Sequence, residues 1–174
     1  MPFTPFHMGP GILIKALLQG SFSLMVFGWA QIVMDIQPLV VLITGEGHLH
    51  GFSHTFLGAT LLGAFAGLSG KYLGEWGLVF LGISKTQNPI AISWRNAVVS
   101  AYIGTFSHVV LDAIMHVDVQ PYFPFSTANN MLNWLNVRQL HHLLLYTAIL
   151  GGLLYFILQL ATHHSTRKRH PEDD

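Results

Sequence analysis

Long apolar stretches recur along the chain and are interrupted by few charged residues. They cover residues 21–44, 52–69, 97–115 and 140–161. A helix needs about 20 mostly apolar residues to cross the hydrocarbon core of a bilayer. Pro38 lacks an amide hydrogen, so we expect it to bend or end the first of these helices. The pattern therefore predicts four membrane-spanning helices.

A shorter apolar segment precedes the first span. Residues 9–19 are followed by Gly20 and Ser21, which can form a turn. At about 1.5 Å per residue, this segment and the first half of the span have similar lengths as helices. We therefore expect a helical hairpin that returns His7 to the level of Asp35 and puts the N-terminus on the outer side. In this hairpin Lys15 would extend toward the inner face.

A second short apolar segment, residues 72–83, carries Glu75 and Trp76 near its start. It is too short to cross a bilayer alone, so it predicts a short interfacial or half-crossing helix. The expected fold is all-α, a polytopic membrane helical bundle of four to five transmembrane helices with one short interfacial helix. We expect one transmembrane domain over residues 1–162 and a mobile cytoplasmic tail over residues 163–174.

Composition supports a membrane protein and excludes several other classes. Of 174 residues, 51% are hydrophobic and only 9% charged, against about 25% charged in ordinary soluble domains. The lipid bilayer is thus the expected partner. The basic residues form no patch outside the extreme C-terminus, which argues against nucleic-acid binding. The absence of cysteine excludes disulfides, thiolate metal sites and cysteine nucleophiles.

The placement of lysine and arginine predicts the orientation. Cytoplasmic loops carry an excess of these residues. If the basic stretch at 167–169 is cytoplasmic, the connection 70–96 is too, and it holds Lys71, Lys85 and Arg95. The outward connections then hold only Arg138. We therefore predict a multi-pass protein with a cytoplasmic C-terminus.

With this topology, all four spans bring ionisable residues to one membrane level. Such residues are expensive inside a bilayer and indicate function by default. At a helix end, however, a histidine can simply bond a neighbouring helix, which is our interpretation of His141 and His142. We assign His48 to a loop and His163, His164 and His170 to the tail. The remaining ionisable residues at this level are Asp35, His50, His54, His108, Asp112 and His116.

Helical spacing links several of these side chains. His108, Asp112 and His116 follow one another at i, i+4 steps, and His50 and His54 repeat the step if the second helix begins by His50. Residues at this spacing have Cβ atoms about 5–6 Å apart, so two of them can hold one metal ion. Imidazole with carboxylate suits zinc, manganese or iron. We predict a divalent metal ion, with zinc favoured, that lowers the pKa of a bound water to about 7.

Four segments, taken in order, resemble the YdjM-type family of inner-membrane metal-dependent hydrolases. They are His7, the MDIQP sequence at 34–38, HGFSHT at 50–55 and GTFSHVVLD at 104–112. The resemblance extends from the start of the chain to about the proline-containing segment at 121–124. It implies a bacterial inner-membrane protein whose metal ligands are His7, Asp35, His50, His54, His108 and Asp112.

The chain departs from the family pattern at several positions. Met34 stands where the family has proline, and Gln37 replaces its second aspartate. Leu49 falls at the first histidine of the next box, so either His50 or His48 could compensate. The lost carboxylate argues against a two-metal site.

We predict a metal-dependent hydrolase that acts on an ester or phosphoester of an amphipathic or lipid-linked substrate. His54, His108 and Asp112, with Asp35 or His50, would hold the ion, and Asp35 or His116 would act as general base. The alternatives are a small membrane transporter or a structural membrane protein stapled by a metal. Polar groups gathered at one level, rather than along a path, argue against transport.

Overall fold

The computed structural model of this chain describes residues 5–169, with side chains described from residue 6 to residue 162. Within this range all regular structure is helical, which confirms the predicted all-α fold. The α-helices are α1 (Met8–Leu18), α2 (Leu24–Thr44), α3 (Phe56–Phe80), α4 (Trp94–Met115) and α5 (Val137–Arg169). Three short 3-10 helices accompany them, η1 (Pro5–His7), η2 (Gln19–Ser21) and η3 (Phe52–His54).

Four helices in the described residues are long and apolar enough to cross a membrane, as the sequence predicts. They cover Leu24–Thr44, Phe56–Phe80, Trp94–Met115 and Val137–Thr162. The backbone of α5 continues to Arg169, and residues 170–174 of the predicted tail lie outside the described residues.

The predicted interfacial helix over residues 72–83 is wrong as a separate element. Most of this segment is the C-terminal part of α3, which continues without a break to Phe80. Lys71 and Glu75 form an i, i+4 ion pair, and Glu75 also accepts a hydrogen bond from the backbone N–H of Ile92. Because these contacts compensate the two charges, the helix can continue past them.

The first span does not end at its proline, in contrast to one of the two expected outcomes. Pro38 lies inside α2, which continues to Thr44. Gly45 ends the helix instead, with a φ of 73° and a hydrogen bond from its N–H to the carbonyl of Val41. This is the left-handed conformation in which glycine commonly follows a helix.

The predicted helical hairpin is present. α1 runs to η2, where the chain reverses into α2. The ammonium of Lys15 donates to the carbonyls of Gln19 (2.7 Å) and Phe22 (2.8 Å), so its charge stabilises the reversal. The amide of Asn96 at the start of α4 donates to the carbonyl of Gly20 (2.7 Å). The hairpin is therefore fixed to the bundle at its turn.

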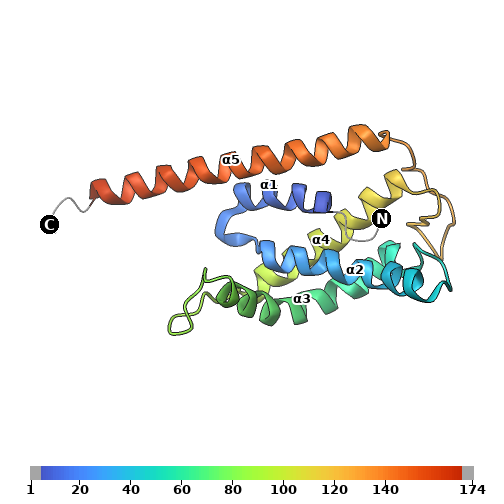
Figure 1. Cartoon of the computed structure of the whole chain (residues 1–174), viewed down its shortest axis with the longest axis horizontal. Helices are drawn as coiled ribbons and strands as arrows, with labels where there is room; N and C mark the ends of the chain where they lie inside the picture. Colours follow the sequence, from blue (N-terminus) through green and yellow to red (C-terminus); the bar gives the residue numbers. More distant parts are fainter. Residues whose placement is uncertain (1–4, 170–174) are drawn as a thin grey trace.

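The helices form a bundle in which α2, α3 and α4 contact one another and α5 lies along α1 (Figure 1). The contact between α1 and α5 depends on small residues. A Cβ atom at Gly9 would collide with the carbonyl of Leu144, and one at Gly151 would lie 2.5 Å from the backbone nitrogen of Leu13. Such close backbone approach is typical of packed membrane helices.

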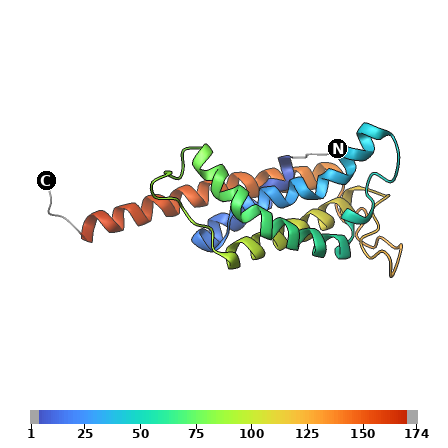
Figure 2. The same ribbon diagram turned by 90° about the horizontal axis from the view of Figure 1, so that it is seen from below.

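Two long connections lie at the same end of the bundle in both views (Figures 1 and 2). One joins α2 to α3 and contains η3, and the other joins α4 to α5. The α3–α4 connection lies at the opposite end. As a result, the second half of α2, the start of α3 and the last turns of α4 meet at one end of the bundle, where the predicted site residues are found.

Candidate metal centre

The carboxylate of Asp112, near the end of α4, lies at the centre of a cluster of imidazoles. Its Oδ2 atom is 3.1 Å from Nε2 of His54 and 3.1 Å from Nε2 of His108. Its Oδ1 atom is 3.4 Å from Nε2 of His7 and 3.9 Å from Nε2 of His116. One buried carboxylate therefore faces four histidines that come from η1, η3, α4 and the segment after α4.

A second carboxylate reaches the cluster from α2. Oδ1 of Asp35 lies 3.4 Å from Nε2 of His108, which places this imidazole between two aspartates. The ligand atoms of Asp35, His54 and His108 all lie within 4.8 Å of one another, and so do those of His50, His54 and Asp112. All of these residues are buried. Since His54 belongs to both sets, the two sets adjoin each other at this imidazole.

Several imidazole nitrogens in this cluster lack a hydrogen-bond partner. They are Nε2 of His54, Nε2 of His108 and both ring nitrogens of His7. An unsatisfied buried polar atom costs about 1–3 kcal/mol, so such atoms need an explanation. A divalent cation would use their lone pairs and the adjacent carboxylate oxygens together. The donor set of nitrogen and carboxylate oxygen fits zinc, manganese or iron.

Hydrogen bonds behind the cluster fix the form of the key imidazole. Nε2 of Gln31 donates to the carbonyl of Gly104 (3.1 Å), which leaves Oε1 of Gln31 facing Nδ1 of His108 at 2.6 Å. An oxygen can only accept here, so Nδ1 of His108 carries the hydrogen. Its Nε2 lone pair is then available on the side of the two aspartates, which is how metal-binding histidines are usually oriented.

The hydroxyl of Ser53 contacts Nδ1 of His54, as Gln31 contacts Nδ1 of His108. Its Oγ atom lies 2.8 Å from Nδ1 of His54. Burial lowers the pKa of His54 below its ordinary value, against the opposing pull of Asp112. This shift favours the neutral imidazole, which is the form that binds metal.

Gln37, which stands where the resembled family has an aspartate, supports the loop that carries His54. Its Oε1 accepts the backbone N–H of Ser53 (2.9 Å), and its Nε2 faces the carbonyl of His48 at 3.5 Å. The amide packs directly over Gly51, where a Cβ atom would collide with it. An aspartate at position 37 would be one methylene shorter and would lack the amide nitrogen that faces His48. In this chain, Gln37 therefore supports the loop and is not part of the cluster.

A shallower group of side chains adjoins the main cluster. Nδ1 of His50 lies 2.9 Å from Oδ2 of Asp118, and the His50 ring stacks on that of His116 with 4.4 Å between centroids. Ligand atoms of these three residues lie within 4.8 Å of one another. Partial burial would raise the pKa of Asp118, but the hydrogen bond with His50, the charge of His50, a backbone hydrogen bond and the charge of His116 together hold the pKa below its ordinary value.

All the predicted site residues lie together at this end of the bundle, namely His7, Asp35, His50, His54, His108, Asp112 and His116. The other histidines with described side chains lie apart from the contacts of the cluster. His141 packs against the ring of Phe6 at 4.9 Å between centroids, while His48 and His142 are exposed. The side chains of the tail histidines lie outside the described residues.

Three residues of the cluster are absent from the sequence prediction: Gln31, Ser53 and Asp118. Gln31 could have been found, because it precedes Asp35 by four residues and so lies on the same face of the helix. Ser53 directly precedes His54 in the sequence, and its hydroxyl contacts the His54 imidazole. Asp118 follows α4, where no helical spacing links it to the cluster.

Comparison with known proteins returns no match: no family model, no curated protein and no solved structure matches the chain. The resemblance to the YdjM-type family therefore stays a prediction based on the four sequence segments.

Proposed function

We propose that this chain is a membrane-embedded metal-dependent hydrolase, of the YdjM type and located in a bacterial inner membrane, that cleaves an ester or phosphoester. The observation that supports this most directly is the buried cluster itself. Imidazole nitrogens of His7, His54 and His108 that lack hydrogen-bond partners face the carboxylate of Asp112, and His108 also faces that of Asp35. The same cluster borders a cavity into which a substrate could enter, since His7 and Asp35 both line that cavity.

His54, His108 and Asp112 would hold the ion, with His7 or Asp35 beside them. Zinc is the favoured ion, and a bound zinc supplies Lewis acidity and lowers the pKa of a water to about 7. Gln31 and Ser53 would keep the two imidazoles in the ligating orientation. The buried surroundings would exclude bulk water from the reacting bond.

Asp35 is the preferred general base. Its carboxylate lies at the edge of the ligand set and lines the cavity, so it can accept a proton from water that approaches a substrate there. His116, the other predicted base, contacts Asp112 at 3.9 Å and stacks on His50. It lies on the side of the shallower group and does not line this cavity.

The reaction is tested with the purified full-length chain in lipid nanodiscs. It is assayed against phosphoester, carboxylic ester and amide substrates, with and without chelator and after addition of zinc, manganese or iron. We expect turnover of one ester class that chelator removes and one of these metals restores. An activity that resists chelation, or no activity on any class, would contradict the proposal.

Substitution of Gln31 by leucine should weaken metal binding while the ligands remain in place. Loss of a group that orients a metal ligand typically costs about 10–100-fold in affinity. Metal affinity is measured by competition with a chromogenic chelator. The matched control is Gln159→Leu, because Gln159 is exposed on α5. Equal affinities in the two variants would show that Gln31 does not orient His108.

The orientation proposed from the Lys/Arg bias places the metal centre on the outer side of the membrane. A fluorescent protein that matures only in the cytoplasm should be bright when fused to the C-terminus. Alkaline phosphatase, which is active only in the periplasm, should be silent at the same position. The reverse result would place the cluster on the cytoplasmic side.

A further inference from the structure

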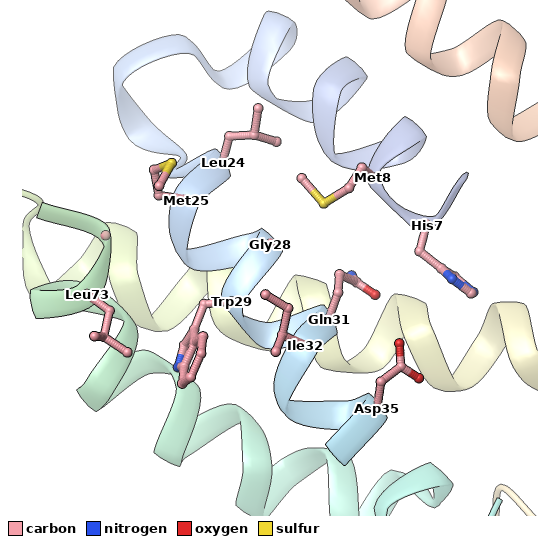
Figure 3. Close-up of a pocket in the computed structure, with 11 residues that line it drawn as sticks. His7, Met8, Leu24, Met25, Gly28, Trp29, Gln31, Ile32, Asp35 and Leu73 are labelled. Carbon is pink, nitrogen blue, oxygen red and sulfur yellow. The ribbon is translucent and has the colours of Figure 1, made fainter. Parts of the chain in front are cut away.

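A cavity of about 510 Å³ lies against α2, between α1 and α3. This is within the usual range of about 300–1,000 Å³ for small-molecule sites. Most of its lining is apolar and includes Leu24, Met25, Trp29 and Leu73 (Figure 3). The cavity could therefore hold an apolar group without leaving buried polar atoms unpaired.

One end of this cavity is polar and belongs to the metal centre. His7, Gln31 and Asp35 lie together there, at the opposite end from Leu24 and Met25 (Figure 3). Gln31 contacts His108, and Asp35 contacts the same imidazole from the other side. A molecule in the cavity would therefore have its apolar part along α2 and its polar part at the metal ligands.

The cavity is accessible from the surface of the bundle that would face lipid. Ile32 and Leu73 line it and are 43% and 44% exposed, and both lie on helices that are long enough to cross a membrane. Leu24 and Asp35 are separated by eleven residues of one helix, a length of about 16 Å. This is about half of the 30 Å hydrocarbon core, which matches the length of a chain in one leaflet.

We propose that this cavity binds one hydrocarbon chain of an amphipathic lipid whose ester or phosphoester head group lies at the His7–Asp35 end. This inference rests on the proposed function and narrows its substrate to a lipid. An outer-leaflet lipid in the predicted topology has its head outward and its chain toward the midplane. The cavity has the same direction, because its polar end at His7 and Asp35 lies nearer the outer side than its apolar end at Leu24.

The cavity aligns the lipid rather than extracting it from the membrane. Bilayer hydrocarbon is as apolar as the cavity wall, so transfer of the chain gains no hydrophobic free energy. Close packing along α2 would instead fix where the head group lies. A displacement of about 1 Å at a reacting bond can cost on the order of 100-fold in rate.

Gly28 allows the cavity to be filled without disturbing the metal centre. It lines the cavity, and a Cβ atom there would make ordinary contacts with Cε and Sδ of Met8 at 3.4 and 3.6 Å. Leucine is also preferred over glycine within a helix, so Gly28→Leu should fold. Ala64→Leu is the matched control, because Ala64 is exposed on α3 and does not line this cavity. Ile32→Trp, at the exposed edge, is a second variant that narrows the entrance.

The probe is a lysophosphatidic acid with a diazirine in its acyl chain, added to the full-length chain after incubation with zinc, and the labelled positions are mapped by mass spectrometry. In the wild type we expect saturable labelling of the 24–35 segment. Unlabelled lysophosphatidic acid should compete, whereas glycerol 3-phosphate at the same concentration should not. Gly28→Leu and Ile32→Trp should lose the saturable labelling, and Ala64→Leu should keep it.

Labelling that cannot be competed, or that is equal in Gly28→Leu and Ala64→Leu, would overturn the lipid site. Metal content and chelator-sensitive turnover of a short, soluble ester are measured in the same samples. If these persist while specific labelling is absent, only the lipid site fails. If labelling behaves as expected but no metal binds, the hydrolase proposal fails and the lipid site stands.

Discussion

Replacement of Asp112 by asparagine should abolish stoichiometric metal binding. The substitution preserves size but removes the negative charge that four histidines face, at 3.1–3.9 Å. Because the carboxylate would bind the ion directly, the loss in affinity should exceed the about 10–100-fold expected for an orienting group. Elemental analysis of the purified protein measures the metal content after exposure to zinc, manganese or iron.

Thermal stability gives a second measurement of the same variant. A ligand that binds only the folded state at 100 times its dissociation constant stabilises that state by about 2.7 kcal/mol. The wild type should therefore show a metal-dependent rise in melting temperature that Asp112→Asn lacks. Without metal, both proteins should still unfold cooperatively.

Two control variants locate the ion. Glu46→Gln removes an exposed carboxylate from the loop between α2 and η3 and should leave metal content unchanged. Asp118→Asn removes the carboxylate of the shallower group and should also leave the buried position filled. If Asp118→Asn loses the metal while Asp112→Asn keeps it, the ion belongs to the shallower group.

The membrane-spanning helices were predictable because each one depends only on the hydropathy of one continuous stretch of sequence. Each span is a run of apolar residues long enough to cross a bilayer, and the pattern found all four. The end of a helix depends on more than hydropathy. Glu75 and Trp76 suggested a separate interfacial helix, but the ion pair of Glu75 with Lys71 lets α3 continue. Pro38 likewise lies within α2, and the helix ends at Gly45.

The candidate site was predictable where helical spacing or motif order links its residues. His108 and Asp112 lie one turn apart on α4, and both contact the same cluster. His7 depended on the hairpin, because only the reversal at η2 brings the chain start close to Asp112. Asp118 and the role of Gln37 depend on how two irregular connections meet, and hydrophobic periodicity carries no information about that.

Asp35→Asn separates a hydrolytic centre from a structural one. Asp35 approaches from α2, and its Oδ1 atom lies 3.4 Å from Nε2 of His108, on a different helix from the His108–Asp112 pair. Asparagine keeps the size of the side chain but cannot accept the proton. If Asp35 acts as general base, the variant should lose about 10²–10⁴-fold in turnover, while metal content and melting temperature stay near those of the wild type.

If the metal only stabilises the fold, Asp35→Asn should lower the melting temperature and have no effect on turnover. The free energy of metal binding would then contribute to folding, so weakening the site should lower the melting temperature, and no chelator-sensitive turnover would exist to lose. A third pattern, in which turnover and metal content fall together, would make Asp35 a ligand of the ion and transfer the role of base to His116. His142→Ala, at an exposed histidine on α5, controls for general effects of substitution. The pair of measurements decides among these roles because only a base can lose turnover while the ion and the fold are retained.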